Sequence, residues 1–224
     1  MNIVGNLWVD KYRPKKLSEL VLPDSYREDF EICIKNKEIG NLLLYGPPGS
    51  GKTAIGQIIA SKNGIIKNQD NLLFINGSAK ESRGIGYIDS VVEPYCKYPP
   101  SGDDKYKIVF IDEIDNSTPD NIKSLRGITE KYSKYVRFIF TCNYVSKIPD
   151  FLHSRTQSYE FKQMPIEFVI NYCKNILEKE EIKFEEKDLK YIVESLYPDI
   201  RKIVNCLQKN SLTKTLRIGK DSVL

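Results

Sequence analysis

A glycine-rich segment, Gly46 to Thr53 with the sequence GPPGSGKT, lies between an apolar run and a stretch with helical spacing. Glycines let the backbone curl so that consecutive N–H groups point at a phosphate, and a helix that starts there adds partial positive charge. Lys52 can reach the β- and γ-phosphate oxygens, and the Thr53 hydroxyl can ligate Mg²⁺. The alternative is a plain turn before a helix, which does not require Lys52 and Thr53 at the start of the helix. We therefore predict that ATP and Mg²⁺ bind here. The residues of this segment predicted to bind ATP are Gly46, Pro47, Pro48, Gly49, Ser50, Gly51, Lys52, Thr53 and Ala54.

A second segment whose residues could take part in catalysis is the apolar run Ile108 to Ile111, which is followed by the adjacent carboxylates Asp112 and Glu113. In an open α/β sheet, the carboxyl ends of the strands face the ligand crevice. Asp112 can there hold the water shell of Mg²⁺, and Glu113 can orient and deprotonate the attacking water. A charged cap between strand and loop is the alternative interpretation. We expect Asp115 to be solvated rather than catalytic.

A polar residue, Asn143, follows the next apolar run in the sequence Thr141-Cys142-Asn143. The glycine-rich segment alone would also suit a small-molecule kinase or a GTPase. A Glu next to an Asp, with a polar residue after the next strand, favours an ATP-hydrolysing protein instead. Asn143 could position the lytic water or sense the γ-phosphate; the alternative is a polar strand terminus that caps a turn.

The rest of the sequence predicts the elements that must position these residues. Short apolar runs bounded by turn residues alternate with longer segments of helical period, which is typical of a parallel sheet with crossover helices. The fold class is therefore α/β, with a doubly wound, five-stranded parallel sheet. The predicted strands are Leu42–Tyr45, Leu72–Asn76, Lys107–Ile111, Val136–Thr141 and Ser158–Phe161. The predicted helices are Asp24–Lys37, Thr53–Lys62, Gly84–Pro94 and Pro119–Tyr132, the last capped by Ser117 or Thr118.

Strand signals stop after Pro165, and from Ile166 onward apolar residues recur only at helical spacing. We therefore predict a nucleotide-binding domain over residues 1–163 and a small all-helical lid domain over residues 164–224. Residues 97–105, which contain two prolines and a glycine, are predicted to form a loop.

Composition and charge exclude several function classes. A chain of 224 residues with 41% hydrophobic residues can bury a full core. Its 34 basic and 30 acidic residues give a net charge of +4, too small for a nucleic-acid coat or a membrane-surface protein. The 5 cysteines are scattered without a CxxC pair, so we expect reduced packing thiols rather than a zinc site. Neither a signal peptide nor an apolar run of roughly 18 residues is visible, which predicts a soluble intracellular protein.

Several segments together resemble the clamp-loader ATPase subunits of the AAA+ class and are similar to replication factor C small subunits. They are Lys11-Tyr12-Arg13-Pro14, GPPGSGKT, IVFIDEID, TCNYVSKI, His153-Ser154-Arg155 and Asp199-Ile200-Arg201-Lys202. The resemblance covers nearly all of residues 7–210. Two further segments look more like the clamp-loader ATPase of T-even-type phages, which implies a viral protein. They are Val21-Leu22-Pro23 and Tyr197-Pro198-Asp199, the latter in place of the Gly-Asp usual in cellular members.

The resemblance implies roles that spacing alone does not assign. It makes Arg155 an arginine finger for the ATP site of a neighbouring subunit, although Thr156 replaces the Cys of the family motif. Arg201 matches the sensor arginine of the lid helix, which would tie the helical domain to the γ-phosphate. Asn76 matches a polar residue that holds the catalytic Glu inactive until DNA binds. The residues that would line the adenine end of the ATP site are Val9, Tyr12 and Arg13.

Three basic residues are candidates for DNA contacts. Lys80 and Arg83 precede a helix that faces the central channel in this family, and with the backbone amides there they could grip phosphates without reading bases. Arg126 matches a position where the family often has paired arginines, but Gly127 replaces the second. Solvated surface is the alternative for all three residues.

These patterns predict the ATPase subunit of a DNA polymerase sliding-clamp loader, which uses ATP to open and load the clamp at primer–template DNA. Its partners would be the clamp, the DNA and other loader subunits in an arc, in the cytoplasm of a cell or phage host, or in a eukaryotic nucleus. Family members continue into a helical collar domain, and since this chain ends at Leu224 we expect the collar to be absent. The alternatives are another DNA-dependent AAA+ remodeller, such as a branch-migration helicase or an initiator-type loader, and a scaffold subunit that binds ATP without hydrolysing it.

Overall fold

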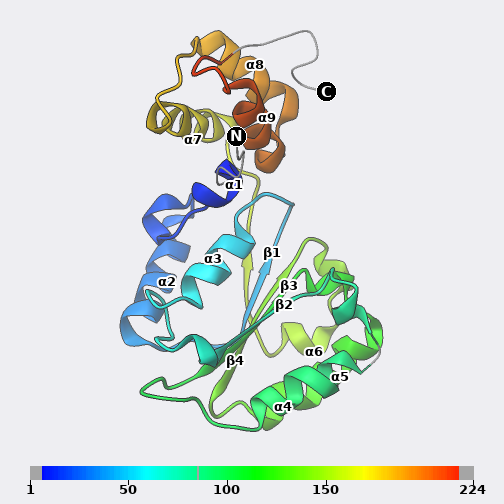
Figure 1. The fold of residues 1–224 in the computed structure, drawn as a ribbon. Coiled ribbons are helices and arrows are strands. Elements are labelled where there is room, and N and C mark those ends of the chain that lie inside the picture. The colour runs from blue at the N-terminus through cyan, green and yellow to red at the C-terminus, as the bar shows by residue number, and fades with distance from the viewer. Residues whose placement is uncertain (1–6, 85, 217–224) are drawn as a thin grey trace, which may run out of the picture. The chain divides into compact units, whose positions relative to one another are not determined.

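The computed structural model describes residues 7–84 and 86–216 of the chain. It contains a five-stranded sheet in the order β2-β3-β4-β1-β5, and every pair of neighbouring strands is parallel (Figure 1). The strands are β1 Leu42–Tyr45, β2 Leu72–Asn76, β3 Lys107–Asp112, β4 Val136–Cys142 and β5 Gln157–Glu160. The predicted five-stranded parallel sheet is confirmed, and each predicted strand boundary is right to within about one residue.

The helices precede, separate and follow the strands as an α/β fold requires. They are α1 Trp8–Lys11, α2 Asp24–Asn36, α3 Lys52–Ile59, α4 Glu93–Cys96, α5 Pro119–Lys131, α6 Asp150–His153, α7 Ile166–Lys179, α8 Glu186–Leu196 and α9 Ile200–Asn210. The longest of them, α7, has 14 residues, and within the described ranges none is long and apolar enough to cross a membrane.

One predicted helix, Gly84–Pro94, has the wrong start, the wrong end and in part the wrong helix type. The structure has a π-helical turn over Ile88–Val92 that runs directly into α4. Gly86 has a φ of 75°, a backbone conformation that an α-helix does not contain. Pro94 lies in the first turn of α4, where a missing N–H is tolerated, rather than at a helix end. The helix therefore starts four residues later than predicted and continues past the proline.

Alternating side chains of the strands pack into two separate layers. Leu42 and Leu44 of β1 share a core with α2 and α3, whereas Leu43 packs with residues of α4, α5 and α6. The strands β3 and β4 alternate in the same way, as the two-residue period of a strand requires. Figure 1 shows α2 and α3 on one face of the sheet and α4, α5 and α6 on the other. The doubly wound arrangement is thus confirmed.

The register of the sheet brings the carboxyl ends of its strands to one edge. Tyr45 at the end of β1 pairs with Cys142 at the end of β4. Asn76 at the end of β2 pairs with Asp112 at the end of β3. Residues that follow these strands therefore lie side by side at the edge where ligands bind in open parallel sheets.

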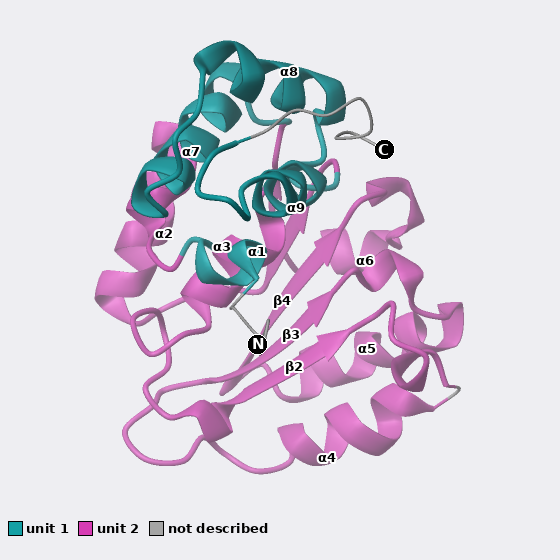
Figure 2. Ribbon diagram, turned by 45° about the horizontal axis from the view of Figure 1, so that its top comes forward, with its two compact units in different colours: residues 1–14, 48–50, 163–224 teal, residues 15–47, 51–162 magenta. Residues whose placement is uncertain are grey.

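Contacts between residues divide the chain into two compact units (Figure 2). One comprises residues 1–14, 48–50 and 163–224, and the other residues 15–47 and 51–162, which hold the sheet. The helical unit has its own core, into which α7, α8 and α9 turn their apolar residues. Trp8 of α1 packs into that core, and its backbone N–H donates a 3.0 Å hydrogen bond to the Gln208 side chain. The predicted division into a nucleotide-binding domain and a lid domain stays a prediction.

Candidate nucleotide site

The glycine-rich segment forms a tight loop between β1 and α3. Gly46, directly after β1, has a φ of 142°, and a Cβ atom there would lie 2.0 Å from the carbonyl oxygen of Phe161. Gly51, the residue before α3, has a φ of 92°. Only glycine occupies both positions without strain. The loop thus delivers the chain to a helix start whose first N–H groups have no partner within the helix, which is the geometry of an anion site.

Lys52 is the first residue of α3 and is buried, with 6% of its surface exposed. Its ammonium group donates hydrogen bonds to the carbonyl oxygens of Gly46 (2.8 Å) and Pro47 (2.7 Å). Burial lowers the pKa of Lys52, whereas nearby acidic side chains, including Asp112 and Asp115, act in the opposite direction. A phosphate group bound in the loop would favour the charged ammonium in the same way.

The two residues predicted to hold Mg²⁺ lie in contact. The Thr53 hydroxyl donates a 2.8 Å hydrogen bond to Asp112 Oδ1, and the Thr141 hydroxyl donates a 2.5 Å hydrogen bond to the same oxygen. Thr141 in turn accepts the backbone N–H of Glu113 at 2.9 Å. Sequence reasoning assigned Thr141 no role, although a hydroxyl near the end of a strand beside an acidic strand is a usable signal. Two oxygen ligands at the start of α3 and the end of β3 form a donor set that fits Mg²⁺.

The Glu113 side chain is hydrogen-bonded by residues to which the sequence analysis gave no role in catalysis. Its carboxylate accepts hydrogen bonds from the Ser78 hydroxyl and from Asn116 Nδ2, the latter at 3.3 Å. Asn116 Nδ2 also donates to the Ser78 hydroxyl at 2.8 Å. The proposed switch residue Asn76 accepts the Ser78 backbone N–H at 2.8 Å. Ser78 therefore joins Asn76 to Glu113, and the role predicted for Asn76 stays a prediction.

Asp115 is not solvated, contrary to the expectation from its sequence position. Only 7% of its surface is exposed. Its Oδ2 accepts the backbone N–H groups of Asn143 (3.2 Å) and Tyr144 (3.1 Å), which directly follow β4. The expectation was wrong because the partners of Asp115 come from a strand end 28 residues away in sequence, which local sequence spacing does not reveal.

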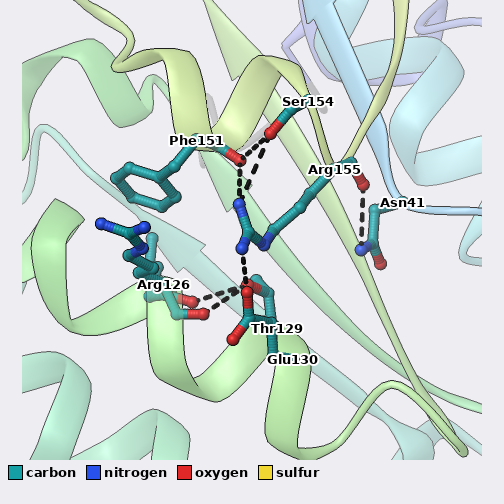
Figure 3. A network of polar contacts seen from close by, with 8 residues as sticks. Asn41, Arg126, Thr129, Glu130, Phe151, Ser154 and Arg155 are labelled. Carbon is teal, nitrogen blue, oxygen red and sulfur yellow. Dashed lines mark hydrogen bonds and ion pairs between the residues drawn. The ribbon is translucent and has the colours of Figure 1, made fainter.

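Arg155 is the second residue after α6, and its side chain is held by neighbours in the same chain (Figure 3). One guanidinium nitrogen forms an ion pair with Glu130 of α5. The other donates to the carbonyl oxygen of Phe151 (3.0 Å) and to the Ser154 hydroxyl (3.4 Å). Its backbone carbonyl accepts from Asn41 Nδ2 at 3.3 Å. In the described part of the chain these contacts reach α5, α6 and Asn41, the residue before β1, and none of them involves the glycine-rich loop.

The predicted DNA-binding residues are all exposed. Arg126 lies on α5 with its guanidinium 5.9 Å from the centre of the Phe151 ring, as Figure 3 shows. A short 3-10 turn over Glu81–Arg83 follows β2; Lys80 directly precedes this turn, and Arg83 is its last residue. Their exposure fits a contact with phosphates and equally a solvated surface, so the DNA-binding roles stay predictions.

The remaining predicted residues belong to the helical unit. The Tyr12 hydroxyl donates to Glu180 at 2.7 Å, and burial is the main cause that raises the pKa of Tyr12. Arg13 forms an ion pair with Asp10 at 3.0 Å. Arg201 is exposed in the first turn of α9, and Val9 is half-buried against the helical core. Within this unit, the loop residues Pro48, Gly49 and Ser50 line a narrow pocket with Tyr197, Pro198 and Ile200.

Comparison with known proteins supports the chemistry of this site. A family model for the "ATPase family associated with various cellular activities (AAA)" matches residues 42–164, which hold the glycine-rich loop, Asp112, Glu113 and Asn143. The chain is 37% identical over 202 residues to the replication factor C small subunit of Archaeoglobus fulgidus, covering 90% of this chain and 63% of that protein. It is 34% identical over 208 residues to the corresponding subunit of Methanothermobacter thermautotrophicus, covering 93% of this chain and 64% of that protein. The chain thus spans less than two thirds of the length of these relatives.

Among solved structures, the Holliday junction branch migration motor RuvB of Thermotoga maritima resembles the fold. The TM-score is 0.69 at 20% identity, and the match covers 95% of this chain and 70% of that one. A mutant form of the same protein matches with a TM-score of 0.71, also at 20% identity, over 95% of this chain and 71% of that one. At this identity the likeness speaks for the fold alone. Together with the family match over more than half of the chain, the sheet order and the loop geometry show that this chain belongs to the AAA family of ATPases.

Proposed function

We propose that this chain binds and hydrolyses ATP with Mg²⁺ as a subunit of a sliding-clamp loader. One observation carries the chemical part of the proposal. The Thr53 hydroxyl, at the start of the helix after the glycine-rich loop, lies 2.8 Å from the Asp112 carboxylate at the end of β3. This contact brings together two protein oxygen atoms that can ligate Mg²⁺ beside phosphates bound by the loop and by Lys52.

The candidate residues of the loop and of the ends of β3 and β4 then each have a proposed task. The loop amides and Lys52 bind the phosphates, and Thr53 and Asp112 hold Mg²⁺. When bound, Mg²⁺ neutralises the negative charge that develops on the phosphate oxygens. Glu113 orients the attacking water and accepts its proton, and Asn143 positions that water or senses the γ-phosphate.

Glu113 must leave its present partners before it can work as a base. The Ser78 hydroxyl and Asn116 Nδ2 both donate to the same carboxylate oxygen, Oε2, so this oxygen must exchange partners before it can accept the proton of the attacking water. We propose that Asn76 takes part in this restraint, because it fixes the Ser78 backbone.

Other predicted residues complete the proposal from outside the sheet unit or from a second subunit. Arg155 would stabilise the γ-phosphate charge of a neighbouring subunit, an effect typically worth about 10³–10⁵ in rate. Arg201 would report the presence of that phosphate to the helical unit. The residues proposed for the adenine end are Val9, Tyr12 and Arg13.

The proposed role in clamp loading is supported by the similarity to known proteins and not by the geometry of the nucleotide site. The name shared by those relatives, replication factor C small subunit, supports a role in DNA replication. The proposed partners are other loader subunits, the sliding clamp and primer–template DNA, with the exposed Lys80, Arg83 and Arg126 on the DNA phosphates. The proposed location is the cytoplasm, and the proposed phage origin rests on the phage-like sequence segments alone, since the relatives described above are archaeal.

Steady-state ATP hydrolysis, measured with companion subunits and with or without primer–template DNA and clamp, tests the proposal. We expect DNA and clamp together to stimulate turnover. Glu113→Gln should lower it by about 10²–10⁴-fold, the usual contribution of a general base. The control Glu160→Gln changes an exposed carboxylate at the end of β5, the edge strand beside β1, and should leave turnover intact. Turnover indifferent to the clamp would indicate another DNA-dependent AAA machine, and turnover no higher than in Glu113→Gln would indicate a scaffold.

A further inference from the structure

Asp115 has a buried carboxylate that the proposed reaction does not use. It lies on the short turn Ile114–Asn116 after β3, with 7% of its surface exposed. Oδ2 accepts two consecutive backbone N–H groups, from Asn143 at 3.2 Å and from Tyr144 at 3.1 Å. Oδ1 is buried and has no hydrogen-bond partner among the described residues.

Folding alone does not favour such a residue. A buried carboxylate oxygen without a donor loses its hydration with no hydrogen bond in return, and an asparagine would offer the two amides the same acceptor oxygen without burying a charge. The contacts that Asp115 does make are charge-assisted and therefore among the stronger hydrogen bonds in a protein. These two hydrogen bonds hold the backbone N–H groups of Asn143 and Tyr144 in place.

The sheet itself does not hold that backbone against β3. The ladder between β3 and β4 ends at the pair Ile111 and Phe140, while β4 continues to Cys142. Beyond this pair, side chains connect the two strand ends. Thr141 joins them through Asp112 and Glu113, and Asp115 joins them through the amides of Asn143 and Tyr144.

We propose that Asp115 is a positioning residue for Asn143. By fixing the two amides that follow β4, it keeps the Asn143 carboxamide aligned with the acidic end of β3, where the attacking water and the γ-phosphate would lie. The inference rests on the proposed function, in which Asn143 touches the reacting groups. Asp115 itself acts only through the backbone of Asn143.

A double-mutant cycle in the ATP hydrolysis assay tests this inference. Because a displacement of about 1 Å near the reacting atoms can cost about 10²-fold in rate, we expect Asp115→Ala to lower kcat by about 10- to 100-fold. The KM for ATP should change by less than about threefold, because the phosphate-binding loop is untouched. The effect should vanish in an Asn143→Ala background, where the double variant should lie within about twofold of Asn143→Ala alone.

Asp115→Asn provides the conservative comparison. It keeps an acceptor oxygen for the two amides and should recover kcat to within about threefold of the wild type, because the proposed role requires an acceptor rather than a charge. If Asp115→Ala loses its cooperative melting transition, Asp115→Ser replaces it in the cycle. The matched control is Asp104→Ala, because Asp104 accepts the backbone N–H groups of Lys67 and Asn68, each at 2.8 Å, in a loop outside the site. This control should lower the melting temperature without changing kcat.

Two results would overturn the inference. An unchanged kcat in Asp115→Ala would show that Asn143 needs no such anchor. If the fold-losses in kcat of Asp115→Ala and Asn143→Ala multiply in the double variant, Asp115 acts independently of Asn143. A wild-type chain with no turnover above the Glu113→Gln variant would instead remove the proposed function, and the inference with it, so the two failures are distinguishable.

Discussion

Arg155 presents a conflict between the contact it makes within its own chain and the role proposed for it in a neighbouring ATP site. In the structure its guanidinium group pairs with Glu130, and 58% of the Glu130 side chain is exposed. An exposed ion pair contributes about 0.2–1 kcal/mol. A phosphate on a neighbouring subunit would have to displace this carboxylate or share the guanidinium with it.

Removing the Glu130 charge should therefore free the Arg155 guanidinium to contact the phosphate of a neighbouring subunit. We predict that Glu130→Gln raises ATP turnover of the assembled protein by up to about fivefold, the rate equivalent of about 1 kcal/mol. Steady-state hydrolysis at saturating ATP measures this. The control Glu185→Gln removes a carboxylate that pairs with Lys187 at 2.7 Å on the surface of the helical unit, and should have no effect. A fall in turnover in Glu130→Gln would mean that the carboxylate aims Arg155 instead of occupying it.

At the scale of elements, α5 is tied to the segment after β2 by one buried amide. Asn121 is 1% exposed, and its Nδ2 donates to the carbonyl oxygens of Ser82 and Gly84, each at 3.0 Å. These bonds fix the segment that contains Arg83, a proposed DNA contact. The position of that segment thus depends on a side chain of a helix 39 residues away in sequence.

Losing this amide should weaken the sheet unit. Asn121→Ala leaves two carbonyl oxygens without their donor, and we predict a loss of about 1–3 kcal/mol in the free energy of unfolding. Urea titration followed by circular dichroism measures it. Lys123→Ala, on the exposed side of the same helix, should change stability by no more than about 0.5 kcal/mol. Equal stability of the two variants would contradict the structural role given to Asn121.

The periodicity of apolar residues in the sequence predicted the sheet but not the contacts between its elements. The strand β1 and the loop that follows it were predictable because apolar periodicity and the GPPGSGKT spacing are local signals. The start of the helix predicted from Gly84 was wrong because Gly86 takes a backbone conformation that tertiary structure selects. Asp115 and Ser78 were missed for a related reason, since each acts on a residue that the fold brings in from another strand end.

At the scale of the whole molecule, the two units carry separate cores and separate spectroscopic signals. The sequence has 1 tryptophan, Trp8, and this side chain is buried in the core of the helical unit. Tryptophan fluorescence therefore reports the environment of that unit. Far-UV circular dichroism reports the helices and strands of both units together.

This separation predicts non-coincident unfolding transitions. The helical unit has the smaller core, and small cores bury a smaller fraction of their surface, so we expect it to unfold first. In a urea titration the Trp8 emission should shift to the red at a lower midpoint than the circular dichroism signal, which is the standard sign that unfolding is not two-state. Tyr135→Trp in a Trp8→Phe background moves the probe to the sheet unit and should report the later transition. Coincident midpoints for both probes and for circular dichroism would instead show that the two units unfold as one cooperative body.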